Sequence, residues 1–287
     1  MFEHFALKQI QTNEATLRVR IGGEGPPLLL LHGHPQTHVM WHKTAPPLAE
    51  HFTVIAPDLR GYGGSSKPQT DENHYPYSKQ AMAKDMVSLM NQLGYNQFAV
   101  AGHDRGGRVA YRLALDEPEK VTRLAVLDIV PTGEAFRRTT MDFGMGYFHW
   151  FFLAQPYDLP EKMISENPEH FYFNGKKDLF DRAALRDYMR WINEPGTIHA
   201  MCEDYRAGAS IDYELDEADR GNKKIQCPTL VLWGKKGMLP RWYNVLDVWQ
   251  DWATHVEGRD LDCGHYLAEE APNETYEELC RFFRKRE

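Results

Sequence analysis

The feature that most restricts the fold of this chain is a series of short, almost entirely apolar segments. Residues 27–32 read Pro-Leu-Leu-Leu-Leu-His, and comparable runs occupy residues 52–57, 97–102, 121–128 and 228–233. Each run is too short for a buried helix, and an apolar run without alternation is typical of a parallel strand covered on both faces. These runs therefore predict the strands of a mostly parallel sheet.

Helical patterns lie between these runs. Amphipathic helices are predicted at residues 105–117 and 276–286, and Ser78 can cap another that Gly94 closes, with its apolar side formed by Met82, Met86, Leu89, Met90 and Leu93. Two alternating runs, at residues 5–10 and 15–21, predict an antiparallel pair at the start of the chain. The order of strands and helices predicts an α/β fold with a doubly wound, mostly parallel sheet.

The alternation stops in the middle of the chain. Residues 131–205 are rich in aromatic residues and methionine and show no clear strand pattern, and strands resume only near residue 226. We interpret residues 131–205 as a helical cap inserted between the two parts of an α/β-hydrolase-like core, residues 1–130 and 206–287.

Composition excludes several classes of function. The chain has 287 residues with 42% hydrophobic content, enough for a sizeable core, and its formal net charge of -8 without a basic stripe argues against a nucleic-acid partner. No segment approaches the roughly 20 apolar residues that a membrane span needs, and the N-terminus has no signal-peptide pattern. Four scattered cysteines suit a reducing compartment. We expect a cytoplasmic protein that does not contact membranes.

One short motif stands where an apolar strand ends and a helix begins: Gly102-His103-Asp104-Arg105-Gly106. A tight turn at such a junction needs small flanking residues and projects its central side chain above the sheet edge. A carboxylate in that position can attack carbon and form an ester that water later hydrolyses. An aspartate at a strand-to-helix junction more often caps the helix, but the flanking glycines favour Asp104 as a nucleophile.

An aspartate nucleophile of this kind needs an acid and a histidine later in the chain. Asp128 stands at the end of the run 121–128, and His265 follows Asp262-Cys263-Gly264 on a loop before the last helix. The other segment where the acid could stand, residues 233–237, contains no carboxylate. We therefore predict His265 as the general base for the hydrolytic water and Asp128 as the group that fixes its tautomer.

The segment after the first core strand contains His32, His34, His38 and His42. The backbone N–H of His34, with that of Arg105, is predicted to form an oxyanion hole. The spacing of the four histidines matches no common metal-ligand set, so no metal is predicted. No cofactor is predicted either.

Arg105 and Arg108 lie three positions apart, on one face of the predicted helix that follows the nucleophile. Two guanidinium groups at a helix N-terminus suit an anion, above all a carboxylate bound in a bidentate fork. Arginine on a helix is more often a solvated surface charge, but beside a buried carboxylate it needs a partner or a substrate. We predict that both bind a substrate carboxylate.

Together the motifs resemble the α/β-hydrolase superfamily over essentially the whole chain. The resemblance rests on the segments 32–35, 58–65, 102–108 and 262–265 with Asp128, and it is closest to the fluoroacetate and haloacetate dehalogenases, through Asp-Arg-Gly-Gly-Arg and a later His149-Trp150 pair. It implies that His149, Trp150 and Tyr205 donate hydrogen bonds to a departing halide. Tyr213 is close enough in sequence to Tyr205 to take its role, and that choice stays open.

The function implied is cleavage of fluoroacetate or chloroacetate to glycolate and halide through an aspartyl ester. The preference between fluoride and chloride stays open, and a homodimer is possible because homodimers are common in the family. An epoxide hydrolase with the same nucleophile is the main alternative, although Arg105 suits a neutral epoxide poorly. A non-catalytic binding protein on the hydrolase fold is a second alternative, and a serine esterase is excluded because position 104 is not serine.

Overall fold

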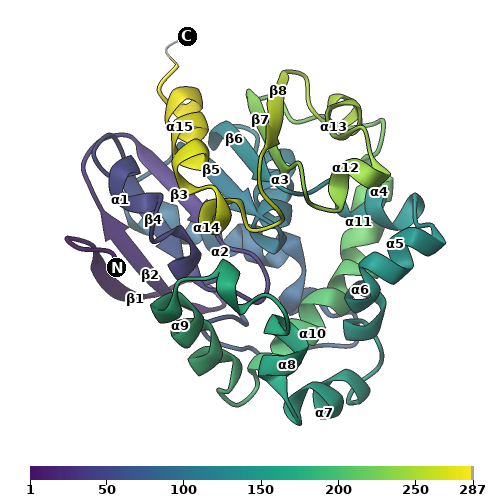
Figure 1. Ribbon diagram of the computed structural model, residues 1–287. Helices are drawn as coiled ribbons and strands as arrows, with labels where there is room; N and C mark the ends of the chain where they lie inside the picture. The colour runs from purple at the N-terminus through teal and green to yellow at the C-terminus, as the bar shows by residue number, and fades with distance from the viewer. Residues whose placement is uncertain (286–287) are drawn as a thin grey trace.

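The computed structural model describes residues 1–285 and contains one eight-stranded sheet in the order β1-β2-β4-β3-β5-β6-β7-β8 (Figure 1). The pairs β1–β2 and β2–β4 are antiparallel, and all later neighbours in this order are parallel. The strands are β1 (Ala6–Gln11), β2 (Thr16–Gly22), β3 (Pro27–Leu31), β4 (Thr53–Pro57), β5 (Phe98–His103), β6 (Val121–Leu127), β7 (Thr229–Gly234) and β8 (Val256–Leu261). The predicted α/β class is confirmed.

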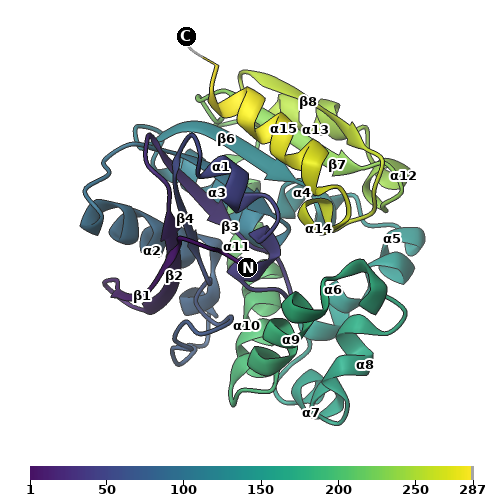
Figure 2. The ribbon, with the colours of Figure 1, turned by 60° about the vertical axis from the view of Figure 1, so that its left-hand side comes forward.

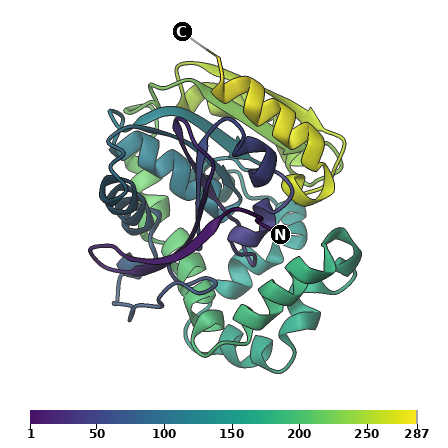
Figure 3. The same ribbon diagram turned by 90° about the vertical axis from the view of Figure 1, so that its left-hand side faces the viewer.

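Helices cover both faces of this sheet, as a doubly wound topology requires (Figure 3). The core helices are α1 (Ala45–Leu48), α2 (Lys79–Gln92), α3 (Arg105–Asp116), α12 (Leu239–Trp242), α13 (Val245–Trp252), α14 (Leu267–Glu270) and α15 (Pro272–Phe283), with 3-10 turns η1 (His38–Trp41) and η2 (Tyr75–Tyr77). Helices α2 and α3 pack against each other, and α3 lies on β5 and β6. The apolar run of β3 is fully buried at Leu28–Leu31, which explains why it lacks alternation.

Two core elements differ from the sequence-based expectation. Strand β8 was not predicted, because its sequence Val-Glu-Gly-Arg-Asp-Leu is polar and lies at the sheet edge. Gly258 permits its close pairing, since a Cβ there would lie 2.0 Å from the carbonyl oxygen of Val231. Helix α15 begins at Pro272, earlier than residue 276, and the predicted end at Arg286 lies outside the described residues.

A layer of helices follows β6 and forms a lobe beside the core (Figure 2). It contains α4 (Thr132–Arg137), α5 (Met141–Gly146), α6 (Phe148–Leu153), α7 (Leu159–Ser165), α8 (Pro168–Phe173), η3 (Lys177–Leu179), α9 (Arg182–Ile192), α10 (Thr197–Gly208) and α11 (Ile211–Asp219). The predicted cap boundary at residue 205 falls inside α10, and α11 then leads to β7.

Two further properties concern the described part of the chain. None of its helices combines the length and the apolar character that a membrane crossing would require. Cys202, Cys227, Cys263 and Cys280 carry free thiols.

Candidate functional site

The backbone at Asp104 has the strained geometry of a nucleophile elbow. Asp104 joins β5 to α3 with φ 48° and ψ -117°, a conformation that costs free energy for any residue with a side chain. A Cβ at Gly102 would lie 2.3 Å from the carbonyl oxygen of Gly106, and a Cβ at Gly106 would lie 2.4 Å from that of His32. The turn therefore closes only with glycine at both positions, which is the reason for the motif.

The two carboxylate oxygens of Asp104 have different surroundings. The backbone N–H of His34 donates to Oδ1 at 2.9 Å, whereas Oδ2 lies 3.9 Å from Nε2 of His265. Burial favours the neutral acid, but His265, His103, Arg108 and Arg105 outweigh it and hold the pKa of Asp104 well below its ordinary value. The group is therefore an anion at neutral pH, with one oxygen fixed and the other facing His265.

His265 contacts Asp128, the acid that the sequence places before it. Nδ1 of His265 lies 2.5 Å from Oδ2 of Asp128, whose Oδ1 accepts the backbone N–H of Gly234 at 2.9 Å. Burial works to lower the pKa of His265, but the hydrogen bond and charge of Asp128, together with the charge of Asp104, raise it above its ordinary value. This contact leaves Nε2 toward Asp104, where it can accept a proton from water.

Asp104 and His265 line a cavity of about 350 Å³ between the core and the cap, and Asp128 lies behind His265. Its wall contains Asp104 and His265 together with His34, Tyr147, His149, Trp150, Tyr172, Lys176, Tyr205, Lys236 and Tyr266. Tyr213 is not in this wall; it lies on α11 with its ring 6.1 Å from that of Phe136. The structure thus places Tyr205, and not Tyr213, beside the other predicted halide donors.

The predicted halide donors carry unused hydrogen-bonding groups. Within residues 1–285, no protein acceptor receives a hydrogen bond from the side chains of His149, Trp150 or Tyr205. Burial lowers the pKa of His149 to about 3, so its imidazole is neutral and has one N–H to donate. Burial and the nearby Asp104 raise the pKa of Tyr205, which keeps its hydroxyl protonated. The cavity therefore offers an imidazole, an indole and a phenol to a small anion.

The two predicted carboxylate-binding arginines lie behind this wall. The guanidinium of Arg105 stacks 4.2 Å from the ring centroid of Tyr205, and that of Arg108 stacks 4.5 Å from that of Trp150. Both are buried, and neither is among the residues that line the cavity. Their charges lower the pKa of Asp104, which places them within electrostatic reach of the site.

Sequence reasoning missed the partner of Arg105. Asp204 on α10 receives hydrogen bonds from Nε and Nη2 of Arg105, at 3.0 Å to Oδ2 and 2.7 Å to Oδ1. The sequence predicts a role for the next residue, Tyr205, but none for Asp204. Residues 200–208 of helix α10 are all buried, and a buried carboxylate needs a nearby cation. An aspartate in so buried a helix was therefore the signal that could have revealed this ion pair.

The clustered histidines have structural partners. His32 accepts the backbone N–H of Leu59 at 2.9 Å, and Nδ1 of His38 lies 2.7 Å from Asp58. In the part of the chain that the structure describes, no group of three or more histidine, cysteine, aspartate or glutamate residues has the arrangement of a metal site.

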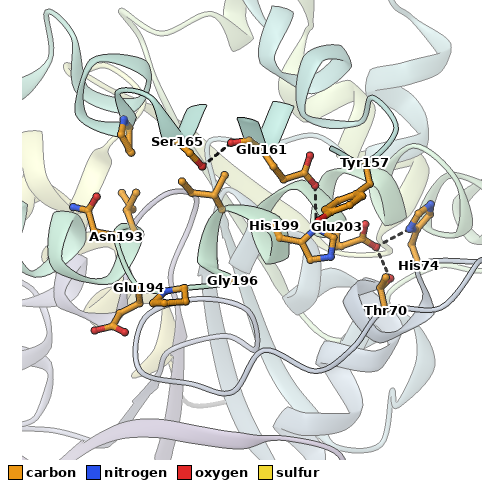
Figure 4. Close-up of a pocket in the computed structure, with 14 residues that line it drawn as sticks. Thr70, His74, Tyr157, Glu161, Ser165, Asn193, Glu194, Gly196, His199 and Glu203 are labelled. Carbon is orange, nitrogen blue, oxygen red and sulfur yellow. Dashed lines mark hydrogen bonds and ion pairs between the residues drawn. The ribbon is translucent and has the colours of Figure 1, made fainter. Parts of the chain in front are cut away.

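A second, larger hollow of about 850 Å³ lies between α7, the α9–α10 turn, α10 and the loop before η2 (Figure 4). Its polar groups are paired with one another: His74 and Thr70 contact Glu203, and His199 contacts Glu161. None of the predicted site residues lines it. The smaller cavity is the candidate active site because it alone of the two contains Asp104 and His265.

Comparison with known proteins decides the family. The profile of the family described as "alpha/beta hydrolase fold" matches residues 26–272. This chain belongs to the α/β-hydrolase family. It is 42% identical to a fluoroacetate dehalogenase of Burkholderia sp. over 98% of this chain and 95% of that protein. The recognition of the fluoroacetate and haloacetate dehalogenases from the motifs is thereby confirmed, and the protein is an enzyme of the α/β-hydrolase family.

Two further proteins are similar to this chain over nearly its whole length. A soluble epoxide hydrolase of Corynebacterium sp. (strain C12) is 33% identical over 96% of each chain. The crystal structure of ALR0039 from Nostoc sp. PCC 7120, assigned to the α/β hydrolases, is 52% identical, has a TM-score of 0.98 and covers 100% of both chains.

Proposed function

We propose that the enzyme hydrolyses short 2-haloacids, with fluoroacetate and chloroacetate giving glycolate and halide. The observation that carries the proposal is the cavity itself: an ionised Asp104 with one fixed oxygen faces His265 on one side and three unused donors, His149, Trp150 and Tyr205, line the same space. The 42% identity with a protein named fluoroacetate dehalogenase supports the same substrate class.

In the first step, Oδ2 of Asp104 attacks C2 of the substrate. The new O–C bond forms as the carbon–halogen bond breaks, and the electron pair of that bond leaves with the halide. His149, Trp150 and Tyr205 donate hydrogen bonds to the departing anion, which replace the water that fluoride in particular requires. The substrate carboxylate points toward Arg105 and Arg108, whose guanidinium groups lie behind the Tyr205 and Trp150 rings of the cavity wall.

In the second step, water hydrolyses the Asp104 ester. His265 takes a proton through Nε2, and the water oxygen attacks Cγ of Asp104. The negative charge then develops on Oδ1, where the His34 N–H already donates, and Arg105 N–H is proposed as the second donor. Collapse of this intermediate returns the proton from His265 to the departing glycolate oxygen and leaves Asp104 as the carboxylic acid. Loss of this remaining proton to solvent restores the Asp104 carboxylate.

The first experiment measures halide release from fluoroacetate and chloroacetate by the wild type, Asp104→Asn and Asp262→Asn. Asp262 is a matched control because its exposed carboxylate pairs with Lys236 outside the triad. We expect halide release by the wild type and by the Asp262 variant, and none by the Asp104 variant. In oxygen-18 water, a single turnover should place the label in Asp104 before any reaches glycolate. Label in first-turnover glycolate would refute the covalent route.

Epoxide hydrolysis is a second candidate function. Tyr147 and Tyr205 both line the cavity beside Asp104 and could donate to an opening epoxide oxygen, and a soluble epoxide hydrolase is 33% identical. Diol formation from a small neutral epoxide, with no halide released from either haloacetate, would replace the dehalogenase proposal.

The possible homodimer stays a prediction, which sedimentation velocity of the purified enzyme tests.

A further inference from the structure

The two arginines beside the nucleophile have different electrostatic partners. Arg105 forms a buried ion pair with Asp204, whereas no carboxylate lies within ion-pair distance of Arg108 among residues 1–285. Nη1 of Arg108 donates instead to the carbonyl oxygen of Val130 and the hydroxyl of Thr132, and its Nε is buried without a partner. Among the described residues, Arg108 therefore has no direct ion-pair partner, and it interacts with the Asp104 anion only through its longer-range charge.

Asp204 is the centre of a buried network that joins the cap to the core. Besides the two side-chain contacts from Arg105, its own backbone oxygen accepts Nη2 of Arg105 at 2.6 Å. Its Oδ1 pairs with the ammonium of Lys79, and its Oδ2 accepts the hydroxyl of Tyr62 at 2.6 Å. Lys79 in turn pairs with Asp212 at 3.1 Å. Two cations and two carboxylates thus balance, with Asp204 and Asp212 on the cap side and Arg105 and Lys79 in the core.

The network also reaches two residues that line the catalytic cavity, Tyr205 and His34. Arg105 lies over the ring of Tyr205, which follows Asp204 on the same helix. The hydroxyl of Tyr62 lies 3.5 Å from Nδ1 of His34, whose N–H binds Asp104. Gly208, one turn after Asp204, makes room for the guanidinium, since a Cβ there would lie 3.1 Å from Nη2 of Arg105. The position of Arg105 is thus set from α10.

We propose that Asp204 is a positioning residue for the haloacid reaction: it holds and neutralises Arg105, and thereby leaves Arg108, which has no ion-pair partner among the described residues, as the cation that matches the substrate carboxylate. Arg105 then contributes a fixed hydrogen-bonding edge, through its unbonded Nη1, and Arg108 contributes net charge. This assignment rests on the proposed function. A buried charge without a counter-charge is costly. Because Asp204 supplies the counter-charge of Arg105, only Arg108 is left to pair with an anionic substrate.

The test compares Asp204→Asn with Asp212→Asn as a matched control. Both residues are buried carboxylates that pair with Lys79, but only Asp204 contacts Arg105. For Asp204→Asn we expect KM for chloroacetate to rise about 10- to 100-fold, as for loss of an oriented charge-assisted contact, while hydrolysis of the ester, once formed, changes little. Asp212→Asn should keep the wild-type KM.

A double-mutant cycle separates positioning from a general structural defect. If Asp204 acts through Arg105, the combined variant Asp204→Asn with Arg105→Gln should raise KM no more than Arg105→Gln alone. Additive effects, or a wild-type KM in folded Asp204→Asn, would overturn the proposal. If Asp204→Asn does not fold, Asp204→Glu, which keeps the charge for Lys79 but displaces the carboxylate, is compared with Asp212→Glu in the same assay.

Failure of the proposed function gives a different result. A wild type that releases no halide would remove the dehalogenase assignment, and the affinity for glycolate, measured by calorimetry, then replaces KM as the readout. Glycolate binding that Asp204→Asn weakens and Asp212→Asn does not would still support Asp204 as the residue that positions the anion site. Equal affinity in both variants would reject it.

Discussion

Replacement of Asp128 by asparagine should separate the two chemical steps. The backbone at Asp128 has φ 53°, a conformation that asparagine tolerates better than most residues. The amide oxygen can still accept the N–H of Gly234, which leaves the amide NH₂ facing Nδ1 of His265. Nδ1 must then accept a hydrogen bond, so the proton of His265 moves to Nε2 and the lone pair needed by the hydrolytic water is lost.

The size of the effect follows from this exchange of tautomers. We expect ester hydrolysis to fall about 10³- to 10⁴-fold, or about 4 to 5.5 kcal/mol in the barrier, as in other triads whose acid becomes an amide. Halide displacement should fall by no more than about 10-fold, because Asp104 stays ionised and gains at most one donor at Oδ2.

The assay is a rapid-mixing measurement of halide release with mass spectrometry of the intact protein. The variant should release one halide per active site in a burst and then stop, with the carboxymethyl ester retained on Asp104. Asp262→Asn, on the same loop as His265 but with an exposed side chain, should turn over like the wild type. A burst that disappears together with steady turnover, or steady turnover within about 10-fold of the wild type, would refute the role of Asp128 in the second step.

Three further outcomes are expected. Arg108→Gln should raise KM for chloroacetate about 30-fold or more because it removes the cation proposed to attract the substrate carboxylate, with a modest fall in Tm; an unchanged KM in steady-state kinetics would contradict this. The rate of ester hydrolysis should fall as pH drops through the pKa of His265. Because the ester removes the Asp104 charge that helps raise this pKa, the acid limb in single-turnover rates should lie below the pKa found by NMR titration of the free enzyme, and a limb at higher pH would contradict the assignment. Lys176→Gln should reduce the salt dependence of kcat/KM, since Lys176 lines the cavity, whereas Lys177→Gln, whose lysine pairs with Glu169, should not.

The fold was largely predictable because its determinants are local. The apolar runs of β3 and β5 are buried on both faces, so they carry a pattern that neighbouring residues alone reveal. The elbow at Asp104 is likewise a local turn that only glycine at positions 102 and 106 permits. Strand β8 lies at the edge, where half-exposed polar residues leave no such pattern.

The sequence by itself determined the class of sheet, the elbow, and the order of Asp104, Asp128 and His265 along the chain, because strand ends and turns depend on nearby residues. Only the tertiary structure decided that Tyr205 and not Tyr213 lines the cavity, and that Arg105 is paired while Arg108 is not. Those outcomes depend on contacts between residues far apart in the sequence, such as Arg105 and Asp204, which are separated by 99 positions. A buried charge pairs with whichever opposite charge lies near it in space, and Asp204 comes near Arg105 only when the cap packs against the core.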